Sequence, residues 1–192
     1  ASDIHLEISP IPRLAGGDLL PLLGDIVITD HLFDDNTEHH LTARLFFKQQ
    51  VSKYARCLVL MGNHEHYHGC IDDSATIYRR FLADVAPHAT LLDDQTEVID
   101  GVAFVGSTLW APCRGEHPLT EIGIGMRMND FRAIRKAVEG DKRATRRFTT
   151  ADARAQHEAS VSFIRAEIAR HNKVVVLTHH APSLQSSTKY QA

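Results

Sequence analysis

A short apolar run that breaks into a polar loop recurs along this chain, and this feature limits its fold most. The clearest case is residues 57–61, which lead directly into Gly62, Asn63, His64 and Glu65. A run of this length that ends at glycine predicts a buried strand followed by a loop. Ligands of open α/β sheets bind just beyond the carboxyl ends of the strands. An amide, an imidazole and a carboxylate at such an end therefore indicate a loop that carries chemistry.

Segments with helical periodicity alternate with these strand-like runs. The ranges that we expect to form helices are 34–55, 72–86 and 150–170, and further strands are expected at 89–92 and 173–178. Asp100 and Gly101 lie between two β-rich runs, 96–99 and 102–105, and predict a hairpin with a type I′ turn. The alternation indicates an α/β fold, and the hairpin adds antiparallel pairing, so we expect a mixed sheet.

Two stretches carry more specific expectations. Pro21 interrupts the apolar run that contains Gly24 and Asp25, and because proline lacks a ladder donor we expect a bulge or a local irregularity there. The stretch 132–147 is rich in arginine and lysine. We interpret it as a solvated helical face, with attraction of an anionic substrate as the alternative.

The composition favours an ordinary globular domain. The 192 residues fit one domain, and 43% apolar with 23% charged residues exclude a disordered chain. A net charge of −3 gives no general attraction to nucleic acid or to anionic membranes. No apolar run is long enough to span a bilayer, and the three cysteines lack C-x-x-C spacing. We therefore expect a cytoplasmic protein without a membrane partner.

Histidine is abundant, with 13 residues, and imidazole is the commonest protein metal ligand. We expect His39 and His40 on the exposed face of a helix, and His66 and His68 lining a cleft or meeting solvent. Candidate metal-ligating residues occur at four places along the chain, namely Asp3 with His5, Asp25 after Gly24, Asn63 before His64, and His179 with His180.

In this order, D-x-H, G-D, G-N-H-E and H-H-A-P resemble the motifs of the calcineurin-like metallophosphoesterases. The resemblance implies an α/β fold of two stacked mixed β-sheets flanked by helices, which is a four-layer sandwich. It also implies a two-metal site built from loops at strand ends. We expect a single domain over 1–192, with 112–150 as an insertion or lid.

The resemblance also implies a role for each matching residue. Asp3 and His5 would bind the first metal, and Asp25 would bridge both metals. Asn63 and His179 would bind the second metal, with His180 as the alternative if the register shifts by one.

His64 would not bind metal; as the catalytic residue it would face the phosphoryl group and the leaving oxygen. The implied enzyme is a hydrolase that acts on phosphate ester bonds, either monoesters or diesters, through metal-bound hydroxide. Carboxylate, amide and imidazole donors without thiolate suit manganese, iron, zinc or nickel. The expected substrate is a small phosphate ester. Two alternatives stay open, a non-catalytic scaffold of the same fold and a nuclease that uses the same metal pair.

Two departures from the family pattern qualify this reading. The family's late Gly-His-x-His motif is absent, and we expect it to follow downstream in the natural protein, because both ends of the sequence look trimmed. The phosphoprotein-phosphatase branch extends its G-D motif with a second Asp and an Arg, where this chain has Ile28 and Thr29. This difference argues against a dedicated protein phosphatase.

Overall fold

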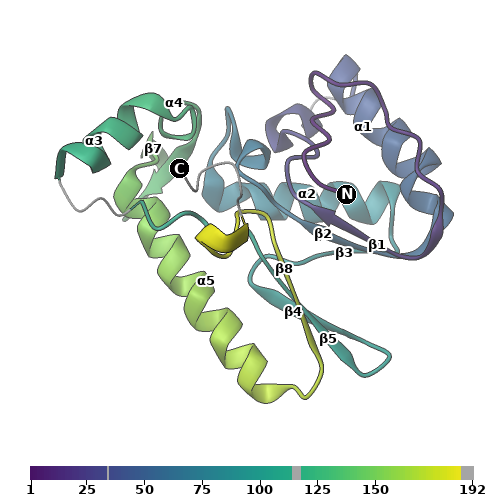
Figure 1. The fold of residues 1–192 in the computed structure, drawn as a ribbon. Coiled ribbons are helices and arrows are strands. Elements are labelled where there is room, and N and C mark those ends of the chain that lie inside the picture. Colours follow the sequence, from purple (N-terminus) through teal and green to yellow (C-terminus); the bar gives the residue numbers. More distant parts are fainter. Residues whose placement is uncertain (34, 114–117, 187–192) are drawn as a thin grey trace.

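The computed structural model describes residues 1–33, 35–113 and 118–186 (Figure 1). Its strands are β1 (Gly17–Leu23), β2 (Tyr54–Leu60), β3 (Ala89–Leu91), β4 (Gln95–Ile99), β5 (Val102–Ser107), β6 (Arg135–Val138), β7 (Asp141–Arg147) and β8 (Val174–Thr178). Its α-helices are α1 (Glu38–Gln49), α2 (Ile71–Val85), α3 (Pro118–Arg127), α4 (Asp130–Ala133) and α5 (Thr150–Arg170). Short 3-10 helices are η1 (Thr29–Leu32), η2 (Val51–Lys53), η3 (His64–His66) and η4 (Leu184–Ser186).

The strands form two principal sheets and one small one. The first sheet has the order β1-β2-β3, and all of its pairs are parallel. The second has the order β4-β5-β8, with β4 antiparallel and β8 parallel to β5. The third is the antiparallel pair β6-β7. The predicted α/β class is confirmed, and the mixed pairing lies in the second sheet.

Strand β2 shows how the two principal sheets stack. Cys57 and Val59 belong to the core that includes buried residues of α1 and α2. Leu58 and Leu60 point to the other side and belong to the core that contains Ile99 of β4. Both faces of β2 are therefore buried, as its continuous apolar sequence requires. Helix α5 contacts β5 and runs beside the second sheet, so helices flank the stacked pair (Figure 1).

The predicted helix 150–170 is confirmed as α5, because its start signal is strong. Thr149 accepts a hydrogen bond from the Asp152 amide, and the Asp152 carboxylate accepts one from the Thr149 amide, which is a capping box. The predicted helix 34–55 was too long, since α1 ends at Gln49. Tyr54 instead pairs with Gly17 at the start of the β1-β2 ladder. The predicted type I′ turn is confirmed by positive φ angles at Asp100 and Gly101.

The expected bulge at Pro21 was wrong. The pairing of β1 with β2 runs without a shift, and Pro21 lies opposite Leu58. The backbone N–H of Leu23, two residues further along, donates a hydrogen bond to the Ala1 carbonyl, so it points away from β2. Amides two residues apart point to the same edge. The missing donor of Pro21 therefore faces away from β2, and the ladder loses no hydrogen bond.

The helical interpretation of 132–147 was also wrong, because most of this stretch forms the hairpin β6-β7. Gly140 adopts a φ of 81° at its turn. Isolated bridges from Tyr67 to Ile134 and from Cys70 to Arg135 attach the hairpin to the loop after β2. These contacts join residues far apart in sequence, so local periodicity could not indicate them.

Two of the four helix and loop histidines are buried, which contradicts the expectation for His40, whereas His66 lines a small cavity as one of its two expected positions. His40 is 2% exposed and packs edge-on against Phe81, whereas His39 is exposed and stacks on His31. His66 is 3% exposed and stacks on Trp110, whereas His68 is exposed. Among the described helices, none combines the length and apolar character that a bilayer span needs.

Candidate metal centre

The N-terminal segment is attached to the end of β1 by backbone hydrogen bonds. The Asp3 amide donates to Gly24 O at 3.1 Å, and the His5 amide donates to Asp25 O at 2.9 Å. Asp3, His5 and Asp25 all adopt left-handed φ angles, between 51° and 54°. Non-glycine residues adopt this region at an energetic cost, so three in one place indicate a geometry that the surrounding contacts impose.

Two glycines allow the strand ends to approach each other. A Cβ atom on Gly24 would lie 2.5 Å from the amide nitrogen of Gly62 and 2.7 Å from Nδ1 of His179. A Cβ atom on Gly62 would lie 2.2 Å from Oδ1 of Asp25. Neither position has room for a Cβ atom, so only glycine fits at either one. The G-D and G-N-H-E motifs thus need glycine because their loops and His179 share one small volume.

Asp25 lies at the centre of this volume and is only 4% exposed. Its Oδ2 lies 3.7 Å from Nε2 of His5, and its Oδ1 lies 3.5 Å from Nε2 of His179. The Oδ1 atom also accepts the backbone N–H of His64 at 2.9 Å. Each carboxylate oxygen therefore faces a different imidazole.

Two groups of possible ligand atoms lie at this centre, and Asp25 belongs to one of them. The ligand atoms of Asp3, Asp25 and His179 lie within 4.8 Å of one another, as do those of His5, Glu7 and His64. Carboxylate and imidazole donors at these separations suit divalent first-row metals. The chemistry and spacing of the donors therefore fit metal ions.

His179 shows most directly that a cation fits. Its Nδ1 lies 2.8 Å from the carbonyl of Leu23, which can only accept, so Nδ1 carries a proton. Its Nε2 then faces Oδ1 of Asn63 at 3.2 Å and the Asp25 carboxylate. Two oxygen acceptors and an imidazole lone pair require a proton or a cation between them. Metal-bound histidines commonly donate their second N–H to a carbonyl in this way.

Asp130 fixes the orientation of the Asn63 amide. It is 2% exposed, and its Oδ1 accepts from Nδ2 of Asn63 at 2.8 Å and from the Tyr67 hydroxyl at 2.7 Å. Because the carboxylate can only accept, the Asn63 nitrogen must face it, and Oδ1 is left for the centre. Sequence reasoning missed Asp130, which lies 67 residues from Asn63 and in no recognisable motif.

Glu65 joins two loops and does not face the centre. Its carboxylate accepts the backbone N–H groups of Asp25 at 2.9 Å, Ile26 at 2.8 Å and Gly62 at 2.7 Å. Complete burial, followed by the charge of Asp25, raises the pKa of Glu65 against the effect of these donors. The final residue of the G-N-H-E motif is thus a structural link between the ends of β1 and β2.

Glu7 is a second residue that sequence reasoning missed. Its Oε1 lies 3.0 Å from Nδ1 of His64 and 3.0 Å from Nδ1 of His5. Burial would raise the pKa of Glu7, but hydrogen bonds to His64, to its own backbone and to His5 outweigh burial and lower the pKa to about 2. Burial opposes the charged form of His64, yet the bond to Glu7 and the charge of Asp25 raise its pKa. The position of Glu7, two residues after His5, was the available signal.

The structure brings all the predicted site residues together, namely Asp3, His5, Asp25, Asn63, His64 and His179. The pairing differs in one respect from the implied roles, because Asp3 groups with His179 and His5 groups with Glu7 and His64. His180, the alternative to His179, packs its ring against Trp110 at 5.5 Å.

Two stacked sheets with carboxylate, amide and imidazole groups gathered at their strand ends match the arrangement of a metal-dependent phosphoesterase fold. The family model of the calcineurin-like phosphoesterases matches residues 1–191, and the chain belongs to that family. The predicted family is thereby confirmed, and the members of this family are metal-dependent phosphoesterases.

Two known proteins are similar to the chain. An uncharacterized protein of Acanthamoeba polyphaga mimivirus is 26% identical over an alignment of 197 positions. The alignment covers 94% of this chain and 66% of that protein. The crystal structure of a phosphopantetheinyl hydrolase from Mycobacterium tuberculosis matches with a TM-score of 0.51 and 13% identity, over 94% of this chain and 66% of that one. The structural match shows a shared fold. The chain spans about two thirds of the length of both proteins.

Proposed function

We propose that this protein hydrolyses phosphomonoesters or phosphodiesters with two metal ions held around Asp25. The observation that carries the proposal is the Asp25 carboxylate, whose two oxygens face His5 on one side and His179 on the other. A shared carboxylate can hold two cations about 3.5–4 Å apart, close enough for one phosphate group to contact both.

Each side of Asp25 offers its own ligands. Asn63 and His179 would hold one ion, with Asp3 within reach, and His5 would hold the other. When bound, such ions activate water and neutralise phosphate oxygens. The oxygen and nitrogen donors suit manganese, iron, zinc or nickel.

His64 would act on the leaving oxygen. Its Nδ1 is held by the ionised Glu7, and its ring stacks on Tyr67 with centroids 4.2 Å apart. These contacts fix the ring and favour its protonated form, so Nε2 can donate a proton or a hydrogen bond. Glu7 would thus be a positioning residue for His64.

The substrate would be a small phosphate ester. The name of the structurally similar mycobacterial protein describes hydrolysis of a phosphopantetheinyl group, which is compatible with a diester or monoester substrate. Specificity would depend on the region 112–150, which we propose to be an insertion that borders the centre. Asp130 already connects this region to Asn63.

Turnover of p-nitrophenyl phosphate and of its bis ester tests the proposal, with and without manganese. We expect manganese-dependent release of nitrophenol, and His64→Ala should lower kcat about 10²–10⁴-fold, the range for loss of a general acid. His171→Ala, at the end of α5, is the matched control and should keep full activity. No metal-dependent turnover of either ester, with no effect of His64→Ala, would exclude the proposed reaction.

A further inference from the structure

A polar cavity of about 190 Å³ lies between helices α2 and α5, beside the loop that follows β2. The residues that decide its chemistry are His66, Asp72, Asp93, Asp94, Thr108 and Trp110. None of the proposed metal ligands lines it, and neither does His64. One water molecule takes up about 30 Å³ in the liquid, so the cavity has room for a ligand of only a few heavy atoms.

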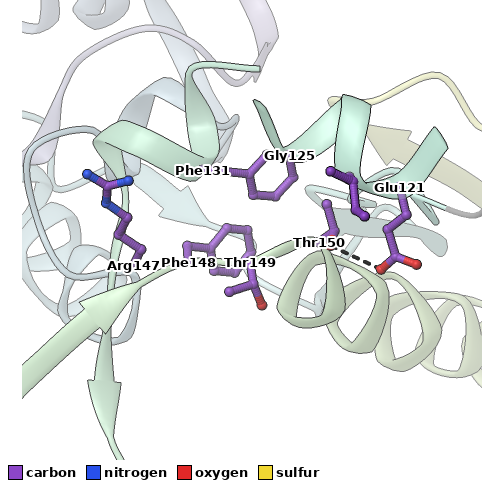
Figure 2. Close-up of a pocket in the computed structure, with 8 residues that line it drawn as sticks. Glu121, Gly125, Phe131, Arg147, Phe148, Thr149 and Thr150 are labelled. Atoms are coloured by element: carbon purple, nitrogen blue, oxygen red, sulfur yellow. Dashed lines mark hydrogen bonds between the residues drawn. The ribbon is translucent and has the colours of Figure 1, made fainter. Parts of the chain in front are cut away.

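A larger cavity, of about 470 Å³ beneath α3, does not offer comparable chemistry (Figure 2). Its aromatic residues Phe131 and Phe148 are 6% and 1% exposed and belong to the core. The guanidinium of Arg147 points away from it, and Glu121 accepts the Thr150 hydroxyl at 3.0 Å (Figure 2). The charged side chains of that lining are therefore turned away or already engaged.

The polar cavity contains a buried imidazole with an unpartnered nitrogen. His66 is 3% exposed, and its Nδ1 has no hydrogen-bond partner among the described residues. Burial lowers the pKa of His66 to about 3, so the ring stays neutral and offers one N–H and one lone pair. Buried polar atoms are rarely left without a partner. The lining therefore favours a ligand that can form hydrogen bonds.

The charges that line the cavity are all negative. The lining holds three carboxylates, those of Asp72, Asp93 and Asp94, and neither a lysine nor an arginine. Only Asp72 is offset from outside the cavity. Lys136 lies 3.4 Å from its Oδ1, and the Ala137 amide donates to its Oδ2 at 2.9 Å.

Asp93 and Asp94 have no cation bound to them. Asp94 accepts the Ser160 hydroxyl at 3.1 Å, and neither carboxylate forms an ion pair with another residue that the structure describes. Burial and then the charge of Asp94 raise the pKa of Asp93, while the charge of Arg79 opposes the rise only in part. The guanidinium of Arg79 is directed to Gln95, 3.3 Å from its Oε1. A cation inside the cavity would relieve the repulsion between the two neighbouring carboxylates.

The spacing of these groups does not suit a single metal ion. In the part of the chain that the structure describes, the groups of three possible ligands that gather within 4.8 Å belong to the metal centre, and none includes His66 or the carboxylates of this cavity. Groups set further apart are better bridged by a ligand with several donors than by one ion.

We propose that this cavity binds a small organic cation of the guanidinium type. Its positive charge would lie beside Asp93 and Asp94, and one of its N–H groups would donate to the neutral ring of His66. A guanidinium group has several N–H donors in one plane and no acceptor, which matches a lining of carboxylates and an imidazole lone pair. The proposal is independent of the proposed phosphoesterase activity.

Trp110 is the only tryptophan of the chain and lines the cavity, so its fluorescence reports directly on binding. Titration of the full chain with methylguanidinium, at constant ionic strength and far below denaturing concentrations, should give a saturable change. Methylurea, a neutral molecule of nearly the same shape, should give none, because it does not offset the carboxylates. No saturable change with methylguanidinium, or an equal change with methylurea, would overturn the proposal.

Two alanine positions provide a matched pair of variants. Ala75 of α2 lines the cavity, so Ala75→Leu would fill it and should weaken methylguanidinium binding at least about tenfold. Ala166→Leu, at an exposed position of α5, makes the same change in a helix and should bind like the wild type. Circular dichroism confirms that both variants are folded. Equal binding by the two folded variants would place the cation elsewhere and contradict the proposal.

The charge preference is tested by an isosteric change that leaves the cavity its shape. Asp93→Asn should weaken methylguanidinium binding about three- to fivefold, as expected for loss of an exposed ion pair. Asp100→Asn removes the same charge at the turn of β4-β5, where asparagine is favoured, and should leave the affinity unchanged. Equal affinities in Asp93→Asn and Asp100→Asn would show that the cavity does not recognise a cation.

Discussion

At the scale of single residues, the centre depends on groups that hold its proposed ligands in orientation. Glu7 fixes His5 and His64, Asp130 fixes Asn63, and the Leu23 carbonyl fixes His179. Such supporting hydrogen bonds determine which atom of each ligand faces a metal, and their loss typically weakens metal affinity.

Removal of the Asp130 carboxylate should weaken metal binding. In Asp130→Ala, the Asn63 amide loses the acceptor that holds its nitrogen away from the centre. We expect an affinity about 10–100-fold lower by calorimetric titration with manganese. Tyr67→Phe is the control, because it removes a hydroxyl that bonds to Asp130 at 2.7 Å and contacts Nδ2 of Asn63 at 3.4 Å, while the shorter bond from Asn63 to Asp130, at 2.8 Å, stays in place. Equal affinities in the two variants would show that Asp130 does not orient Asn63.

Glu65→Gln should destabilise the fold. The new amide would turn an N–H₂ group toward backbone donors that now meet a carboxylate oxygen, and buried donors would lose their partner. Each unsatisfied group costs about 1–3 kcal/mol, so urea unfolding should show a loss of at least that size. Glu139→Gln, on the exposed turn of β6-β7, should be neutral. An unchanged midpoint in Glu65→Gln would contradict the linking role.

His66 should make stability depend on pH. Burial lowers its pKa to about 3, against about 6.5 in the unfolded chain. The unfolded state therefore binds the proton first as pH falls below about 6.5, and the folded state loses up to about 1.4 kcal/mol per pH unit down to about pH 3. His66→Phe keeps the ring against Trp110 and removes this dependence. Urea unfolding in EDTA at several pH values should show a smaller slope in the variant; identical slopes would refute the assignment.

The site residues that belong to a recognisable motif could be predicted from the sequence. The residues that hold them in orientation could not. Asp25 and Asn63 follow strand-like runs, so their type and place both indicated a ligand. Asp130 has no such context, because only the folding of α4 against the loop after β2 brings it to Asn63. His66 has the same residue type as the ligands, and only its packing on Trp110 separates it from them.

At the scale of elements, the sequence predicted correctly those helices and hairpins that are stabilised by residues within the same segment. Helix α5 carries its own capping box and has the predicted bounds. The hairpin β4-β5 carries its own turn residues. The hairpin β6-β7 depends on bridges to Tyr67 and Cys70, and its basic sequence did not indicate a strand.

The cap of α5 provides a prediction at this scale. Thr149→Ala removes the side-chain acceptor for the Asp152 amide and should cost about 1 kcal/mol of stability. Thr149→Ser keeps a hydroxyl and should retain most of it. Thermal unfolding followed by circular dichroism compares the two; an equal loss in both variants would argue against the cap.

At the scale of the whole molecule, the centre forms where the ends of both principal sheets meet. Asp25 and Asn63 follow β1 and β2 of the first sheet, while His179 follows β8 of the second and bonds back to Leu23. Stacking of the sheets through β2 is therefore what brings the ligands together, and a metal held by all of them would bind the folded state alone. Metal binding should accordingly raise thermal stability.

The number of metal ions tests the central claim most directly. Full-length protein loaded with manganese should contain two ions per chain by elemental analysis, with the electron paramagnetic resonance spectrum of a coupled pair, since Asp25 would join them. Asp25→Asn should lose the coupling and at least one ion, while Asp141→Asn, on the exposed β7, should keep both. A wild-type protein that holds one ion or none, or two uncoupled ions, would contradict a centre shared through Asp25.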